Sequence, residues 1–100
     1  MVEFVNCFEV PAGREGEFFD LWRRVNASMV AKPGYRSHRL HRAISPQARF
    51  RFVNLATWES AQAWQDAHDA RFRDLVTGPE WEGITSTPAL YEIVHDGAVG

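Results

Sequence analysis

The stretch FVNLATWES, residues 52–60, decides the fold and raises the first question about function. Apolar and β-branched residues dominate its first part, which is typical of a buried strand that leads into the start of a helix. Asn54 interrupts this run, four residues before Trp58. Alternate residues of a strand share a face, so Asn54 and Trp58 point to the same side. A buried amide costs free energy unless it has a hydrogen-bond partner, and this position therefore needs an explanation.

Strand and helix patterns repeat on both sides of this stretch. Alternation with period two predicts strands, and apolar residues at steps of three and four predict helices. The expected elements are a strand at 2–10, a helix at 14–31, strands at 35–44 and 49–58, a helix from Ser60 to about Leu75, and a strand at 89–95. We expect residues 96–100 to form a loose tail.

This order of elements predicts an α+β domain over residues 1–100 with the ferredoxin-like, split βαβ fold. Its antiparallel sheet has the strand order 4-1-3-2, with both helices on one face. Val5 and Leu55 lie on the opposite face of the two central strands and are apolar as well. An apolar sheet face left open is usually an interaction surface. We therefore expect a homodimer whose two sheets pack face to face.

Composition excludes several classes of partner. The chain has 11 Lys and Arg and 13 Asp and Glu residues, with a formal charge of −2, unlike the clustered basic surface of a nucleic-acid-binding protein. Cys7 is the single cysteine, so neither an internal disulfide nor a cysteine metal cluster can form. The first residues do not resemble a signal peptide, and no apolar run reaches the roughly 18 residues of a membrane span. We expect a cytoplasmic protein without nucleic-acid or membrane partners.

The face that carries Asn54 is the candidate binding site. Period two places the following residues on this face of the first and third strands: Phe4, Asn6, Phe8, Phe52, Asn54 and Trp58. If these strands are neighbours, both amides enter one apolar layer beneath the helices. An apolar cavity with a few convergent polar groups is the usual form of a small-molecule site. The residues leave open whether the amides bind a ligand or local backbone groups.

The histidines are weaker candidates. His68 lies four residues after Trp64 and four before Phe72, so the three share a stripe of the second helix. His68 either faces the same layer or lies partly solvated at the margin of the stripe. His38 and His41 fall on opposite faces of their strand and cannot converge on one ion. We therefore expect no metal site.

Several of these segments resemble the antibiotic biosynthesis monooxygenase (ABM) domain. They are VNCFEVPAG at 5–13, PGY at 33–35, VNLATWES at 53–60 and the final ALYEIV run. The resemblance covers nearly the whole chain, and TWES is its most specific part. Members of this family are typically dimeric α+β barrels, so the resemblance implies the homodimer that the two apolar sheet faces also predict.

The resemblance implies two chemistries, of which the first is cofactor-independent oxygenation. The anthrone and polyketide monooxygenases of the family carry an Asn and a Trp at the spacing of Asn54 and Trp58, and an aromatic residue where this chain has Trp64. An arginine on their second helix is loosely matched by Arg73 or Arg71. These enzymes oxidise aromatic substrates with dioxygen and use no metal, flavin or haem. Asn54 would then be the donor to an oxyanion and Trp58 a wall of the site.

The second chemistry is haem degradation, which Asn6 matches in part. The Trp and the iron-ligating His of that branch fall at Ala67 and at Leu75 or Val76, so His68 would have to replace the ligand from a different turn. A third hypothesis is a non-catalytic protein that binds a small molecule. Cofactor-independent oxygenation leads, with Asn54 and Trp58 as catalytic residues. The expected substrate contacts are Phe4, Asn6, Phe8, Phe52, Trp64, His68, Phe72 and Arg73.

Overall fold

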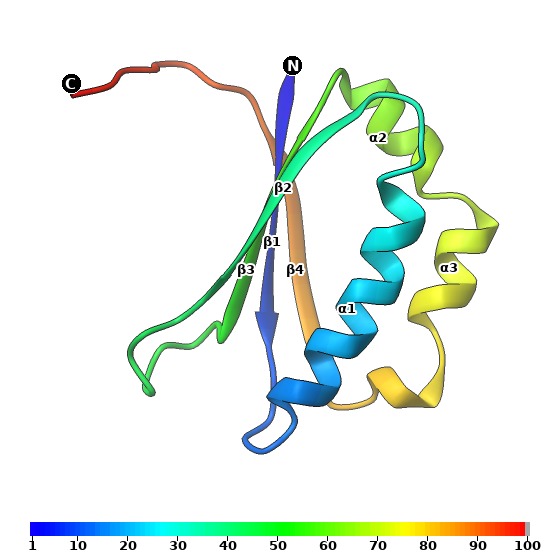
Figure 1. Cartoon of the computed structure of the whole chain (residues 1–100), viewed down its shortest axis with the longest axis vertical. Helices are drawn as coiled ribbons and strands as arrows, with labels where there is room; N and C mark the ends of the chain where they lie inside the picture. Colours follow the sequence, from blue (N-terminus) through cyan, green and yellow to red (C-terminus); the bar gives the residue numbers. More distant parts are fainter. Residues whose placement is uncertain (100) are drawn as a thin grey trace.

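One four-stranded sheet and the helices packed on one of its faces form the structure, a computed structural model that describes residues 1–99 (Figure 1). The elements are β1 (Val2–Glu9), α1 (Glu15–Met29), β2 (Tyr35–Arg42), β3 (Phe52–Trp58), α2 (Ala61–Ala67), α3 (Ala70–Val76), a 3₁₀ helix (Pro79–Trp81) and β4 (Thr85–Tyr91). Within residues 1–99, no helix is long and apolar enough to cross a membrane.

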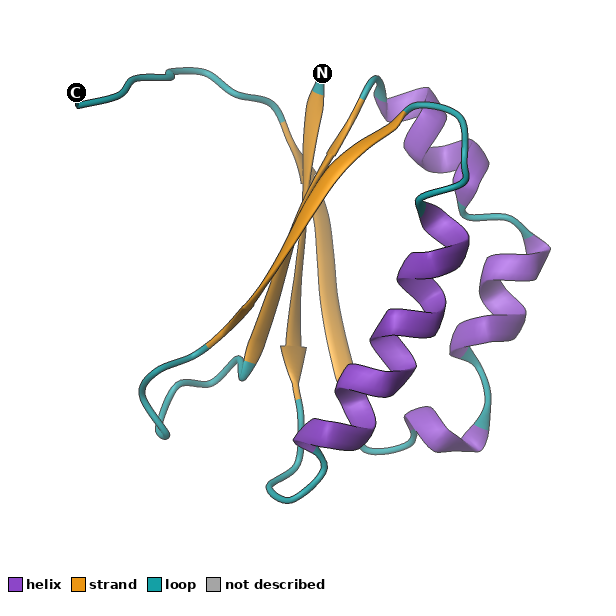
Figure 2. Cartoon of the chain, in the orientation of Figure 1, coloured by secondary structure: helices purple, strands orange, loops and turns teal. Residues whose placement is uncertain are grey.

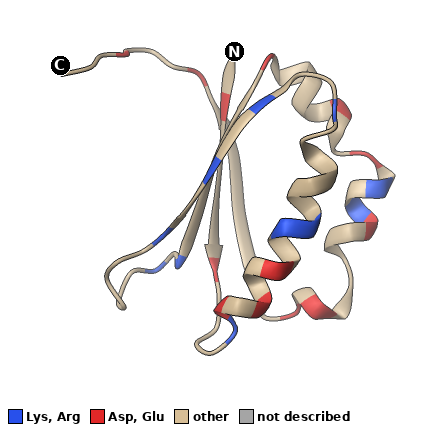
Figure 3. Ribbon diagram, viewed as in Figure 1, with Lys and Arg blue, Asp and Glu red and all other residues tan. Residues whose placement is uncertain are grey.

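The sheet has the order β2-β3-β1-β4, and all neighbouring strands are antiparallel. This is the predicted order 4-1-3-2 read from the other edge, so the ferredoxin-like fold is confirmed. All the helices lie on one side of the sheet, while the opposite face carries none of them (Figure 2). Both acidic and basic residues occur on α1 and α3, whereas the charged residues of β2 are all basic and those of β1 are all acidic (Figure 3).

The last strand lies earlier in the chain than the alternation indicated. We expected it at 89–95, but β4 spans Thr85–Tyr91 and pairs along the length of β1, from Glu3 opposite Tyr91 to Glu9 opposite Thr85. Pro88 is tolerated because β4 is an edge strand, where a missing N–H need not break a ladder. Residues 92–99 lie outside helix and strand, and residue 100 of the expected tail lies outside the described residues.

The second predicted helix is divided into two. His68 leaves helical geometry at φ −88° and ψ 61°, and Asp69 caps a new helix by accepting a hydrogen bond from the backbone N–H of Phe72 at 3.0 Å. The Asp69 carboxylate also receives the Lys32 ammonium at 2.7 Å, and this bond lowers the pKa of Asp69 to about 2. A capping residue with a charged partner thus overrides the continuous apolar stripe that predicted one helix.

The other predicted bounds are slightly too wide. Residues 43–44 lie beyond β2, residues 49–51 precede β3, and α1 begins at Glu15 and ends at Met29. The ends of strands and helices were predicted from the last apolar residue of each pattern, whereas backbone hydrogen bonds define where an element ends.

Two apolar clusters form the core between the sheet and the helices. In one, the ring of Phe18 lies 4.8 Å from that of Phe8 and 4.6 Å from that of Phe52, measured between centroids. The other consists of Phe4, Met29, Ala56, Trp58 and Ala67. Phe18 is fully buried and Trp58 is 1% exposed, so the strands and helices are fixed firmly at both clusters.

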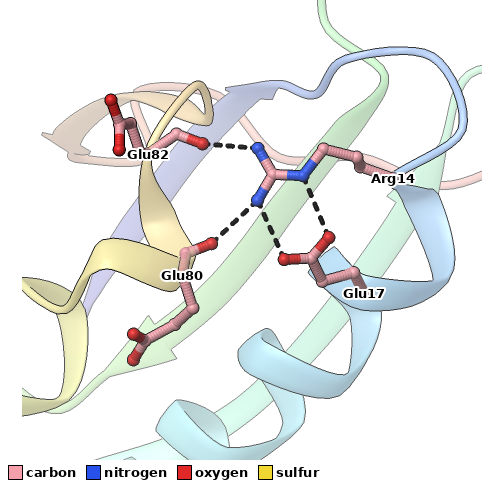
Figure 4. Close-up of polar contacts among 4 residues, drawn as sticks. All are labelled: Arg14, Glu17, Glu80 and Glu82. Atoms are coloured by element: carbon pink, nitrogen blue, oxygen red, sulfur yellow. Dashed lines mark hydrogen bonds and ion pairs between the residues drawn. The ribbon is translucent and has the colours of Figure 1, made fainter.

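Arg14 fastens the segment after α3 to the start of α1 (Figure 4). Its guanidinium donates to the backbone carbonyls of Glu80, at 2.8 Å, and of Glu82, and to the Glu17 carboxylate at 2.9 Å. Trp81 lies between the two tethered carbonyls, and its indole N–H donates to the carbonyl of Leu75 at 2.8 Å. These bonds fix the position of the Trp81 ring against the core.

We predict that Gly34→Ala lowers the free energy of unfolding by about 2 kcal/mol or more. Gly34 has φ +87°, and a Cβ added there would lie 2.5 Å from the Cβ of Ala63. The matched control is Gly16→Ala, because Gly16 lies in α1 and an added Cβ there meets nothing within 4 Å. Urea unfolding measures both variants. Equal stability of the two proteins would contradict the close approach of the α1–β2 turn to α2.

Candidate functional site

A cavity of about 330 Å³ lies between the sheet and the helices. Its wall is largely apolar, and its volume falls in the range of small-molecule sites. The residues that line it include Phe4, Asn6, Phe8, Trp22, Asn26, Met29, Tyr35, Asn54, Ala56, Trp58, Trp64, His68, Phe72, Val76, Trp81 and Ile84. Both core clusters therefore border the cavity.

The two amides of the central strands face each other in this cavity. Asn6 and Asn54 are direct partners in the register of β1 and β3. Asn54 is 8% exposed. The Oδ1 atoms of both residues are buried and have no hydrogen-bond partner within the described chain. Local backbone groups thus do not satisfy these oxygens, and two acceptors remain for a partner that enters the cavity.

Two indole N–H groups add donors to the same wall. The Nε1 atoms of Trp58 and Trp64 are buried and also lack a partner among residues 1–99. An indole N–H can only donate, and it usually finds an acceptor when buried, as that of Trp81 does with the carbonyl of Leu75. The cavity therefore offers donors and acceptors on an otherwise apolar surface, which suits a flat aromatic molecule that carries oxygen atoms.

His68 is half-buried and lines the cavity, at the point where α2 ends. Its Nδ1 lies 2.6 Å from the carbonyl oxygen of Trp64, so the ring proton is on Nδ1 and donates to that oxygen. The ring lies 4.3 Å from that of Trp64 and 4.4 Å from that of Phe72, between centroids. Burial lowers the pKa of His68, which favours the neutral imidazole.

Tyr35 and Asn26 line the cavity but were not among the predicted site residues. The Tyr35 ring meets Trp58 edge to face at 5.1 Å between centroids, and its hydroxyl donates to Asn26 Oδ1 at 3.1 Å. Burial raises the pKa of Tyr35 to about 12, so the phenol stays protonated. A register shift between Tyr35 and Ser37 hid Tyr35 from period-two reasoning. Asn26 lies four residues after Trp22, a spacing that could have revealed it.

Two predicted substrate contacts do not line the cavity. Phe52 is buried against Phe18 in the core. Arg73 is exposed on α3. The structure brings the remaining predicted residues together around the cavity: Phe4, Asn6, Phe8, Asn54, Trp58, Trp64, His68 and Phe72. Across residues 1–99, no group of three or more His, Cys, Asp or Glu side chains could hold a metal ion.

The fold and the cavity define an α+β domain of the ferredoxin-like class with a cavity lined by aromatic residues. The family model described as antibiotic biosynthesis monooxygenase matches residues 1–74. The chain belongs to this family. None of the curated protein sequences compared with the chain matches it.

Solved structures place the chain beside oxygenases. A candidate monooxygenase from Shewanella loihica is 29% identical, with 95% of each chain covered and a TM-score of 0.84. SnoaB, a cofactor-independent oxygenase from Streptomyces nogalater, is 28% identical, with 95% of this chain and 94% of that chain covered and a TM-score of 0.78. Family membership and these neighbours support monooxygenase activity.

A haem-degrading protein shares the fold. MhuD from Mycobacterium tuberculosis, solved with two haems in its active site, is 23% identical, with 98% of this chain and 100% of that chain covered and a TM-score of 0.73. At this identity the likeness concerns the fold alone.

Proposed function

We propose that the protein is a monooxygenase that oxidises an aromatic, polyketide- or quinol-like substrate with dioxygen, without metal, flavin or haem. The observation that carries this proposal is the pair of amides, Asn6 and Asn54, in an apolar cavity lined by aromatic rings, with buried Oδ1 atoms that have no partner among residues 1–99. The likeness to SnoaB, named as a cofactor-independent oxygenase, supports the same chemistry.

The reaction needs little from the protein because the substrate supplies the electrons. A phenolic substrate that loses a proton becomes an electron-rich anion, which can pass an electron to dioxygen. When a ring methylene becomes a carbonyl, the substrate loses two hydrogens and four electrons. One oxygen atom of O₂ enters the carbonyl, and the other leaves as water with the two hydrogens. Atoms and electrons balance without an external reductant.

Asn54 is the residue to which we assign the stabilisation of the anion. An amide N–H held at the oxygen where negative charge develops lowers the barrier, and it acts more strongly where water is excluded. The Trp58 ring, held by Tyr35 and almost fully buried, provides a fixed wall for the flat substrate. Asn6 is placed to contact a second polar atom of the same molecule, because it lies directly across from Asn54.

We predict that Asn54→Ala lowers turnover of an anthrone about 10²-fold or more, and that Trp58→Phe causes a smaller loss. Oxygen uptake measures both. The control is Gln62→Ala, which changes an exposed side chain bonded to Asp66 on α2 and should leave turnover intact. Full activity of the Asn54 and Trp58 variants would refute the site assignment. No uptake with anthrones or dihydroquinones would favour a binding protein without catalysis.

Haem degradation is the second candidate, and His68 is the observation in its favour. Its Nδ1 is occupied by the Trp64 carbonyl, so Nε2 is the nitrogen that could bind iron. However, the positions that the haem-degrading branch uses for its iron ligand fall at Leu75 or Val76, which have no ligating atom. The residues therefore do not fit haem as that branch binds it, and this function ranks second.

A haemin titration separates the two candidates. If the cavity serves aromatic substrates without haem, we expect no stoichiometric Soret shift, and ascorbate should not bleach added haemin faster than it does in buffer. A saturable shift that His68→Ala abolishes would place haem degradation first. A shift that persists in His68→Ala indicates adsorption elsewhere on the protein and leaves the order of the candidates unchanged.

We also propose a homodimer through the open face of the sheet. Val5 lies opposite Leu55 on one side and Ala89 on the other, and these residues alternate with those that line the cavity. None of the helices among residues 1–99 lies on the sheet face opposite the cavity (Figure 2). Leu55 is 38% and Tyr91 is 55% exposed, a large apolar exposure for the centre and edge of a sheet. Two such faces in contact would remove this surface from water.

We predict a mass of twice 11.4 kDa by light scattering at micromolar concentration. Leu55→Asp should give the monomer mass, because it places a charge at the centre of the proposed contact. The control is Val94→Asp, since Val94 is 87% exposed beyond the end of β4. A monomer mass for the unmodified chain would contradict the proposed dimer.

A further inference from the structure

Three side chains form a hydrogen-bonded chain from the cavity wall to the protein surface. The Tyr35 hydroxyl donates to Asn26 Oδ1 at 3.1 Å, and Asn26 Nδ2 lies 3.3 Å from His38 Nε2. Tyr35 and Asn26 line the cavity, whereas His38 is exposed on the edge strand β2. None of these three residues belongs to the proposed catalytic pair, so the chain has no role in the oxygenation step as described above.

The chemistry of the three groups fixes the direction of each bond. An amide nitrogen can only donate, so His38 Nε2 must accept, and the neutral ring then carries its proton on Nδ1. Both the Oδ1 and the Nδ2 atom of Asn26 are hydrogen-bonded, so the amide cannot rotate by half a turn without losing both bonds. Tyr35 therefore has to donate to Asn26, and the phenol oxygen keeps its lone pairs for another donor.

We propose that Tyr35 is a specificity-determining residue whose oxygen accepts a hydrogen bond from a hydroxyl group of the substrate, and that Asn26 and His38 hold it in this accepting state. The inference rests on the proposed function, because it assumes that the cavity binds an aromatic molecule. It adds that this molecule carries a free hydroxyl group beside Trp58, the ring that Tyr35 contacts.

A donor at position 38 in place of the His38 acceptor would reverse the arrangement. In His38→Lys the ammonium group can only donate, so Asn26 must turn to present Oδ1 to position 38 and Nδ2 to Tyr35. Tyr35 then accepts from Asn26, and its own proton points to a ligand acceptor. The charged side chains that share the surface hollow with His38 are Asp20, Arg23 and Arg24 of α1. Tyr35 of the same strand lies beside the His38 ring, and Ala56 is its register partner on β3.

Ultraviolet Raman spectroscopy reads the state of Tyr35 without a ligand. The chain has two tyrosines, so in Tyr91→Phe the tyrosine doublet reports Tyr35 alone. We expect a donating hydroxyl in the chain with His38 and an accepting one in His38→Lys, whose ammonium group can only donate. In the matched variant His38→Gln, whose side-chain oxygen can accept as His38 Nε2 does, the donating state should persist. A doublet that is the same in His38→Lys as in the chain with His38, or that changes equally in His38→Gln, overturns the inference.

Equilibrium dialysis then tests the specificity. The probes are 2-naphthol and 2-methylnaphthalene, which match in shape and differ in one hydroxyl group. Tyr35→Phe should weaken the binding of 2-naphthol about fivefold, the loss of one hydrogen bond, and leave that of 2-methylnaphthalene unchanged.

The outcomes separate this inference from the proposed function. If both naphthalenes bind but Tyr35→Phe affects them equally, Tyr35 does not determine specificity, and the proposed oxygenase function is untouched. If neither binds while the Raman doublet switches as expected, the hydrogen-bonded chain exists, but the cavity is not an aromatic site. That result overturns both the proposed function and the role of Tyr35 in substrate recognition.

Discussion

The pairing of β1 with β3 is the constraint on which the site depends, because it sets Asn6 directly opposite Asn54. Both strands are central, so each has a ladder on either side, and their backbone groups are largely committed to neighbouring strands. The helices above contribute mainly apolar side chains. The amide oxygens consequently have no partner among the described residues, and no group of the fold offsets the cost of burying them.

The helices that cover the cavity are held by polar contacts in addition to apolar packing. The two helices α2 and α3 have seven residues each and would be marginal in isolation. Their positions depend on the cap at Asp69, on its bond to Lys32, and on Arg14, which holds the segment after α3. These hydrogen bonds and the ion pair, at the ends of α2 and α3, thus fix the position of the helices above the sheet.

The sequence predicted those parts of the structure that local periodicity and element order determine. Alternation and topology were sufficient to bring Asn54 and Asn6 together, because a one-residue shift in register would reverse both faces. The break at His68 was missed because the apolar spacing continues through it, and this spacing does not reveal that Asp69 caps a second helix. The position of β4 was missed because an edge strand need not be apolar. Tyr35 was hidden by the register shift that brings it over Trp58.

The polar side chains of the cavity differ in how tightly the surrounding core constrains them. Asn6 and Asn54 project from central strands between packed aromatic rings, so their surroundings are fixed by the core. Tyr35 lies on the edge strand, and its hydrogen bonds run through Asn26 to His38 at the surface. Under the proposed function, the chemistry would stay on the central strands, while the edge strand and α1 would select the substrate. We therefore expect substitutions at Tyr35, Asn26 and His38 to change substrate preference without changing the pairing of β1 with β3.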